Sequence, residues 1–167
     1  MTENFLAKIF EHNNWANQKI IEACYALSDE QLDALPQSAT EGSIRSTLLH
    51  LVSAQMNYLR TLTLPLEERQ DRAWVDFANL SEVLKDSGER LLELASDESK
   101  LPATRLQTRD EHYVESWVLM VQIINHAAEH REQIKSMLTA LGVTPPSIDG
   151  WDYGDATNAL MPIPKQS

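Results

Sequence analysis

Apolar residues recur along most of the chain at spacings of three and four, which is the period of an amphipathic α-helix. The first run extends from Thr2 to Leu27, and its apolar stripe consists of Leu6, Ile9, Phe10, Ala16, Ile20, Cys24 and Leu27. The residues from Ser28 to Gln31 have the pattern of a capping box, which predicts a short extra turn before Pro36.

The same period predicts three more long helices. One runs from about Ser43 to Leu64 and stops before Pro65, and the next runs from about Asn79 to Ala95. The last runs from about Val114 to Leu141, with Gly142 as its C-cap.

The polar stretch from Leu101 to Glu111 is expected to be an extended crossover rather than a helix, because it contains Pro102 and alternates threonine with arginine. No strong strand pattern is present, so the sequence predicts an all-α fold, a four-helix bundle with a long crossover connection. Glycine and proline are sparse and the sequence has no internal repeat. We therefore expect a single domain over residues 1–167, with 145–167 as an irregular C-terminal tail.

The excess of acidic residues argues against some classes of binding partner. The chain has 167 residues, with 14 Lys and Arg against 25 Asp and Glu, a net charge of −11 at pH 7. Such a surface repels phosphates, which argues against general nucleic-acid binding and against an acidic membrane surface. The lone Cys24 excludes an intramolecular disulfide and a multi-cysteine metal site. The sequence shows neither a signal peptide nor an apolar membrane segment, so a cytoplasmic protein is expected.

Five histidines are candidate metal ligands: His12, His50, His112, His126 and His130. Only His126 and His130 stand four residues apart on one predicted helix, where their side chains point within roughly 40° of each other and lean toward the core. Two neutral imidazoles one turn apart can bind one metal ion. From the residues alone, an equal alternative is a pair of histidines that hydrogen-bond to backbone and carboxylate groups.

A third ligand is less clear from the pattern. His50 lies on the shoulder of the apolar stripe of the second long helix, which suits either a cleft between helices or a surface edge. His112, at a junction between loop and helix, and His12, on the flank of the first helix, are expected to be solvated.

Two other helical metal sites can be tested against the sequence. A ferritin-like di-iron centre is excluded, because no histidine here has a glutamate three residues before it. The segment from His126 to His130 matches the H-x-x-E-H pattern of inverted zinc proteases. Glu129 turns away from the apolar stripe, however, and the short remainder of the chain offers no second domain for a substrate cleft.

Four segments resemble the DinB/YfiT-like superfamily of small bacterial helical proteins: SIRSTLLHLVSAQ, NHAAEHREQIKSMLTALG, TPPSIDGWDYG and HNNWANQKI. The resemblance covers nearly the whole chain in order, and H-x3-H-R-x-Q is its most specific part. It implies a four-helix bundle that holds a divalent metal on three histidines, which by position are His50, His126 and His130. Nickel or zinc is the implied metal, with iron as an alternative, and a homodimer is also implied.

The resemblance also implies an activity. Characterised relatives are thiol-dependent enzymes, including mycothiol-dependent isomerases and bacillithiol S-transferases, so a metal-dependent transferase that uses a low-molecular-weight thiol is expected. A non-catalytic metal-binding or stress-response module and a metal-dependent hydrolase are the alternatives. The segment after His50, LVSAQMNYLR, lacks an acidic residue that relatives often have there, which argues against an activity that depends on that carboxylate.

Polar residues inside apolar stripes are further candidates. Asn13 and Asn17 fall within the stripe of the first helix, where buried amides need partners. They indicate either a polar pocket within the bundle, where they would bind substrate or support a ligand, or a structural hydrogen bond to a loop. Gln133 is a candidate to orient a metal ligand. Cys24 lies on the same stripe as the two asparagines and is expected to be a buried, inert thiol.

Four residues outside the apolar stripes, three of them aromatic, need a different explanation. Asp149, Trp151 and Tyr153 lie in a tail without helical period, and we expect them either to cover the mouth of a pocket or to pack as a surface clasp. Trp15 points away from the stripe of the first helix, so it is expected to lie under another segment or in a subunit contact.

Overall fold

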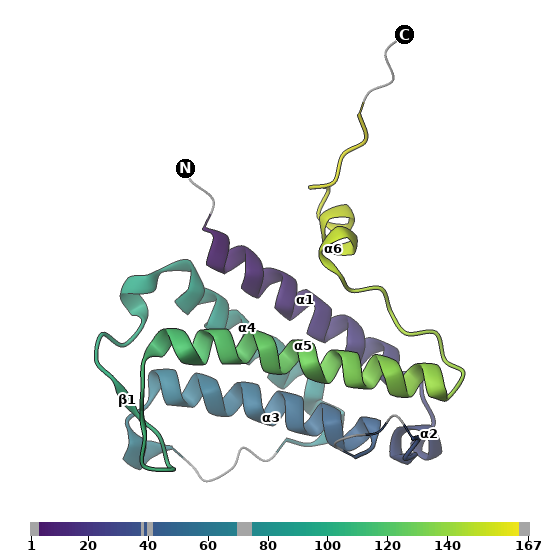
Figure 1. Cartoon of the computed structure of the whole chain (residues 1–167), viewed down its shortest axis with the longest axis horizontal. Coiled ribbons are helices and arrows are strands. Elements are labelled where there is room, and N and C mark those ends of the chain that lie inside the picture. The colour runs from purple at the N-terminus through teal and green to yellow at the C-terminus, as the bar shows by residue number, and fades with distance from the viewer. Residues whose placement is uncertain (1–3, 38, 40–41, 70–74, 164–167) are drawn as a thin grey trace.

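The structure is a computed structural model, which describes residues 4–37, 39, 42–69 and 75–163. This part of the chain contains six α-helices and one small sheet (Figure 1). The helices are α1 (Phe5–Tyr25), α2 (Asp29–Asp33), α3 (Ile44–Thr63), α4 (Leu80–Ser96), α5 (Ser116–Ala140) and α6 (Gly150–Ala156), and the strands are β1 (Leu106–Gln107) and β2 (Tyr113–Val114). Short 3-10 helices lie at Leu66–Glu68, Phe77–Asn79 and Glu98–Lys100. None of the described helices is long and apolar enough to span a membrane.

The helix ends follow the local signals in the sequence. The predicted capping box forms at Ser28, at the start of α2, and Ser43 caps α3 through its side-chain oxygen. The end of α5 is a Schellman motif, in which Gly142 has a φ of +73° and the N–H of Val143 donates to the carbonyl of Leu138 at 2.9 Å. The four long helices therefore lie within a few residues of their predicted positions.

Each of the four long helices packs against two others. Both α1 and α3 contact α4 and α5. Asn4 Nδ2 donates to the carbonyl of Ala95 and Asn14 Nδ2 to the carbonyl of Gly88, so α1 and α4 run antiparallel. The chain is thus mostly helical, as the sequence predicts.

The helices α3 and α4 run parallel. Their N-terminal halves share one apolar cluster through Leu48 and Leu80, and their C-terminal halves share another through Leu62 and Leu94. The connection from the end of α3 to the start of α4 must therefore return along the length of the helices. Within this connection, residues 70–74 lie outside the described part of the chain.

The stretch from Leu101 to Glu111 differs from the expected crossover. It joins α4 to α5 at one end of the molecule, and it contains β1, which pairs antiparallel with β2 in the register Leu106 to Val114 (Figure 1). The extended backbone expected there is present, but it forms half of a hairpin. Two residues per strand are too few to give a periodic signal in the sequence.

The interior consists of two apolar clusters with polar residues where they meet. The first cluster includes Ile20, Ile44, Leu48, Leu80, Ile134 and Leu138, and the second includes Phe10, Leu59, Leu91, Leu119 and Ile123. Each long helix has buried polar residues near the junction of the clusters, namely Asn13, Asn17, Gln55, Ser87 and Arg131. We call these five residues the polar layer.

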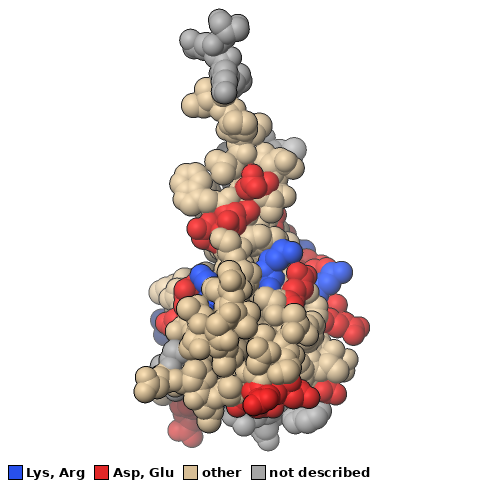
Figure 2. All heavy atoms as spheres, turned by 90° about the vertical axis from the view of Figure 1, so that its right-hand side faces the viewer, with Lys and Arg blue, Asp and Glu red and all other residues tan. Residues whose placement is uncertain are grey.

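The C-terminal segment is not wholly irregular, which corrects the sequence prediction. Asp149 caps the two-turn helix α6 by accepting hydrogen bonds from the N–H groups of Trp151 and Asp152 at 2.8 and 3.0 Å. The sequence did not reveal this helix because seven residues are too few to establish a period. Figure 2 shows the segment standing out from the body of the molecule, with acidic side chains along it.

Candidate metal centre

Three histidines from two antiparallel helices meet between α3 and α5. His50 comes from the first half of α3, and His126 and His130 come from successive turns of α5. The Nε2 atom of His126 lies 3.1 Å from Nε2 of His50 and 3.1 Å from Nε2 of His130. One ligand nitrogen from each ring lies within 4.8 Å of the other two. The structure thus brings together all three histidines that the family resemblance implies.

The donor set fits a divalent metal ion. Nitrogen ligands at about 2.0–2.1 Å from a tetrahedral zinc ion lie about 3.3 Å apart, close to the two 3.1 Å separations here. Where three imidazole nitrogens converge on one point, one shared proton can bridge only two of them. The third nitrogen then directs its lone pair at the others without a proton between them. A cation at that point would satisfy all three. Three imidazoles suit zinc, nickel, iron and copper.

The side chain of Gln133 fixes one of the rings. Its Oε1 lies 2.7 Å from Nδ1 of His130, and because an amide oxygen can only accept, Nδ1 carries the proton. In its neutral form, the ring of His130 with the proton on Nδ1 presents an unprotonated Nε2 to the cluster. This is the tautomer that a metal ligand needs.

The three rings differ in their access to solvent. His50 is exposed, His126 is half-buried and His130 is buried. Burial, with smaller contributions from the charges of His130 and His50, lowers the pKa of His126 to about 4. His126 is therefore neutral at pH 7, as metal binding requires. His50 is the member of the cluster most exposed to solvent.

Tyr58 is a neighbour of the cluster that the sequence analysis did not identify. Its ring stands edge-on to the ring of His126, with the centroids 5.7 Å apart. Tyr58 lies eight residues after His50, so at about 100° per residue the two side chains project about 80° apart and lie on the same side of α3. That spacing is the signal that could have found it, once His50 was taken as a ligand.

Asn13 and Asn17 are structural partners of a buried cation. Arg131 Nη1 donates to Oδ1 of Asn13 at 2.7 Å and to Oδ1 of Asn17 at 2.6 Å. Burial lowers the pKa of Arg131 to about 10, so its guanidinium is still charged at pH 7. The partner is thus a side chain of α5 and not a loop. Arg131 falls on the apolar stripe of α5 together with Ala127 and Ile134, a pattern that could have indicated its burial.

The remaining histidines do not join the cluster. His112 is exposed and lies near the carboxylate of Asp110, as expected for a solvated side chain. His12 is not simply solvated, which corrects the prediction. Its Nε2 donates to the carbonyl of Ile148 at 3.0 Å, a contact between residues far apart in sequence.

The C-terminal segment packs on α1. Tyr153 lies against Trp15, with the ring centroids 5.4 Å apart, and its hydroxyl donates to Glu11 at 3.2 Å. Trp15 is therefore covered by another segment, one of its two expected environments. Trp151 remains 73% exposed. Of the two roles expected for this segment, the contacts fit the surface clasp.

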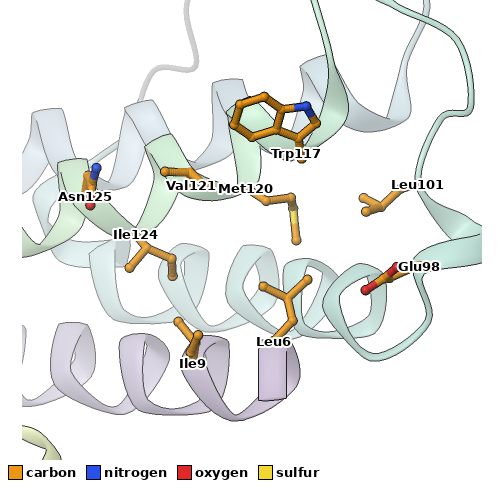
Figure 3. A pocket seen from close by; sticks show the side chains of 9 residues that line it. All are labelled: Leu6, Ile9, Glu98, Leu101, Trp117, Met120, Val121, Ile124 and Asn125. Carbon is orange, nitrogen blue, oxygen red and sulfur yellow. The ribbon is translucent and has the colours of Figure 1, made fainter. Parts of the chain in front are cut away.

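A separate apolar cavity of about 350 Å³ lies between α1, α5 and the residues after α4 (Figure 3). Leu6 and Ile9 of α1 face Trp117 and Met120 of α5 across it, while Glu98 and Asn125 lie at opposite ends. None of the three clustered histidines lines this cavity, so it is distinct from the candidate metal centre.

Comparison with known proteins gives a family and a fold. A family model described as the DinB family matches residues 1–166. One solved structure, from Exiguobacterium sibiricum 255-15 and described as a member of the DinB family, is similar with a TM-score of 0.64 at 15% sequence identity. The match covers 83% of this chain and 93% of that chain, and at this identity it concerns the fold alone. A search of the curated proteins finds no match.

Proposed function

The chain belongs to the DinB family, and from that premise we propose that it is a metal-dependent enzyme that transfers a low-molecular-weight thiol to a small electrophilic substrate. His50, His126 and His130 are the proposed ligands. The observation that carries the proposal is the convergence of their Nε2 atoms, at separations of 3.1 Å from the central nitrogen.

The charge of the ligand set suits thiol chemistry. Three neutral imidazoles leave the full positive charge on a bound divalent ion, and an ion with a further open position lowers the pKa of a thiol or a water bound there. The exposure of His50 supports such an open position, because solvent reaches the ring of one of the three proposed ligands.

The surrounding residues have proposed roles in positioning. Gln133 holds the Nδ1 proton of His130 and keeps Nε2 of this ring directed at the cluster. Tyr58 packs against the ring of His126 and limits its rotation. Asn13 and Asn17 act from the interior, since they bind Arg131 on the turn of α5 that carries His130.

Metal content tests the ligand assignment. We expect near-stoichiometric nickel or zinc in tag-free protein by elemental mass spectrometry, and its loss in His50→Ala and His126→Ala variants whose circular dichroism is unchanged. His112→Ala is the matched control, because it removes an exposed imidazole outside the cluster. Folded wild-type protein that takes up no metal after reconstitution would contradict the proposal and leave a binding module without metal.

Cobalt substitution tests the thiol. A sulfur ligand adds intense charge-transfer absorption to the spectrum of a cobalt-loaded protein, whereas water adds none. We expect this band on addition of a bacterial low-molecular-weight thiol, and its absence in His50→Ala. A cobalt-loaded wild-type protein that shows no such band with any thiol would favour the metal-dependent hydrolase or a non-catalytic site instead.

The detailed arrangement of the helices is also a proposal. The contacts of α1 and α3 with α4 and α5 support a four-helix bundle with one crossover, which we place between α3 and α4. The single domain over residues 1–167, the homodimer and the cytoplasmic location stay predictions.

A further inference from the structure

A cavity of about 230 Å³ opens between α3 and α4, away from the three clustered histidines. Met56, Leu59 and Val83 form its apolar wall. Arg60 and Arg90 line it as well, together with the carboxylate of Asp86. The cavity thus combines an apolar surface with two guanidinium groups that come from different helices.

These two arginines differ from most cations of the chain. The other arginines in the described ranges have partners, as in Arg45, which binds both Asp29 and Asp33. Arg60 Nη1 is inaccessible to solvent and has no hydrogen-bond acceptor in the described ranges. Arg90 likewise forms no ion pair with any described residue. Because Nη1 of Arg60 is out of reach of solvent, a ligand would meet the other N–H groups of this half-buried side chain and those of exposed Arg90. A ligand that supplied a charged acceptor to these donors would be favoured, since hydrogen bonds between charged groups are the stronger ones.

The charge of the cavity defines the ligand further. Two arginines and one aspartate give the lining a net charge of +1, in a chain whose net charge is −11. This lining can neutralise one negative charge of a ligand. The planar guanidinium group also matches a carboxylate in shape and in hydrogen bonding. A phosphate dianion would leave an excess charge beside Asp86.

We propose that this cavity is a binding site for a small monocarboxylate with a short apolar chain. The carboxylate accepts hydrogen bonds from Arg60 and Arg90, and the apolar chain packs against Met56, Leu59 and Val83. The site is independent of the metal centre, because none of its lining residues belongs to the histidine cluster.

Calorimetric titration of the full chain with hexanoate tests the proposal. Hexan-1-ol is the matched probe without the charge, and inorganic phosphate is the probe without the apolar chain. We expect saturable binding of hexanoate and much weaker binding of the other two. Equal binding of hexanol would overturn the role of the arginines, and tighter binding of phosphate would overturn the monocarboxylate.

Single-residue variants locate the site. Arg60→Gln and Arg90→Gln should each weaken hexanoate binding about tenfold or more, the effect of a lost hydrogen bond to a charged group. Lys100→Gln removes one positive charge from an exposed position outside the cavity and should change binding little. If all three variants bind hexanoate like the wild type, or if the wild type binds none, the proposal is wrong. Arg90 is exposed, so its substitution keeps the test valid even if Arg60→Gln does not fold.

Discussion

Gln133 Oε1 lies 2.7 Å from Nδ1 of His130, three residues earlier on the same helix. This hydrogen bond holds the proton of the neutral ring on Nδ1 and leaves Nε2, which faces the other two histidines, without a proton. Without it, both tautomers of the neutral ring are open, and one of them directs a proton at the converging Nε2 atoms. The hydrogen bond therefore prepares the site for a cation before one binds.

The first prediction concerns that hydrogen bond. Gln133→Leu should weaken metal binding about 10- to 100-fold, the usual effect of removing the partner of a metal-ligating histidine. Competition with a chromophoric chelator measures the affinity. Gln133→Glu is the matched variant, because it keeps an acceptor at the same place and should bind metal at least as tightly as the wild type. Equal affinity in all three proteins would show that Gln133 does not orient the ring.

The second prediction concerns the buried guanidinium of Arg131. Arg131→Met should lower the free energy of unfolding by about 3 kcal/mol, because the acceptors of Asn13 and Asn17 lose hydrogen bonds from a charged group. Urea denaturation followed by circular dichroism gives the value. Arg105→Met removes an exposed arginine that pairs with Glu115 and should cost less than about 1 kcal/mol. A similar cost for both variants would contradict a special role for Arg131.

The local parts of the fold could be predicted from the sequence. The stripe of apolar residues located the long helices, and Gly142 marked the end of α5 because its left-handed backbone, with a φ of +73°, favours glycine. The spacing of His126 and His130 gave their common direction. Each of these signals lies within a few residues of the feature that it predicts.

The non-local parts could not be predicted in this way. His12 meets Ile148, 136 residues later, and Trp15 meets Tyr153, and no local period carries such pairings. The position of His50 on the shoulder of its stripe allowed a surface edge as well as a cleft. Only the antiparallel packing of α3 on α5 places it beside His126.

The third prediction concerns the close approach of α1 and α4 at Gly88. A Cβ atom added there would lie 2.8 Å from Oδ1 and 2.9 Å from Cγ of Asn14, whose Nδ2 donates to the Gly88 carbonyl. Gly88→Ala gains helix propensity of about 1 kcal/mol, yet it must displace Asn14, and overpacking costs roughly 1–3 kcal/mol. We expect a net loss of stability of about 1 kcal/mol.

A double-mutant cycle separates these two effects. In the Asn14→Ala background, Gly88→Ala should be neutral or stabilising, because the clash is gone and the gain in propensity remains. The expected coupling energy is about 1 kcal/mol or more, measured by urea denaturation of the four proteins. If the two substitutions have effects that add to within about 0.5 kcal/mol, the close approach of the Asn14 side chain to position 88 is contradicted.

The last prediction concerns Cys24, which is fully buried in the first apolar cluster. Burial raises the pKa of its thiol to about 12, because the thiolate loses its solvation there. At pH 8 the native protein should therefore resist iodoacetamide, which reacts with the thiolate, and should become labelled in urea. The raised pKa also means that the contribution of the thiol to stability is fully present below the pKa of the unfolded chain and is lost as the pH rises toward 12. Mass spectrometry of labelled protein with and without urea checks the first expectation, and rapid labelling of the folded protein would show that the thiol is reactive rather than inert.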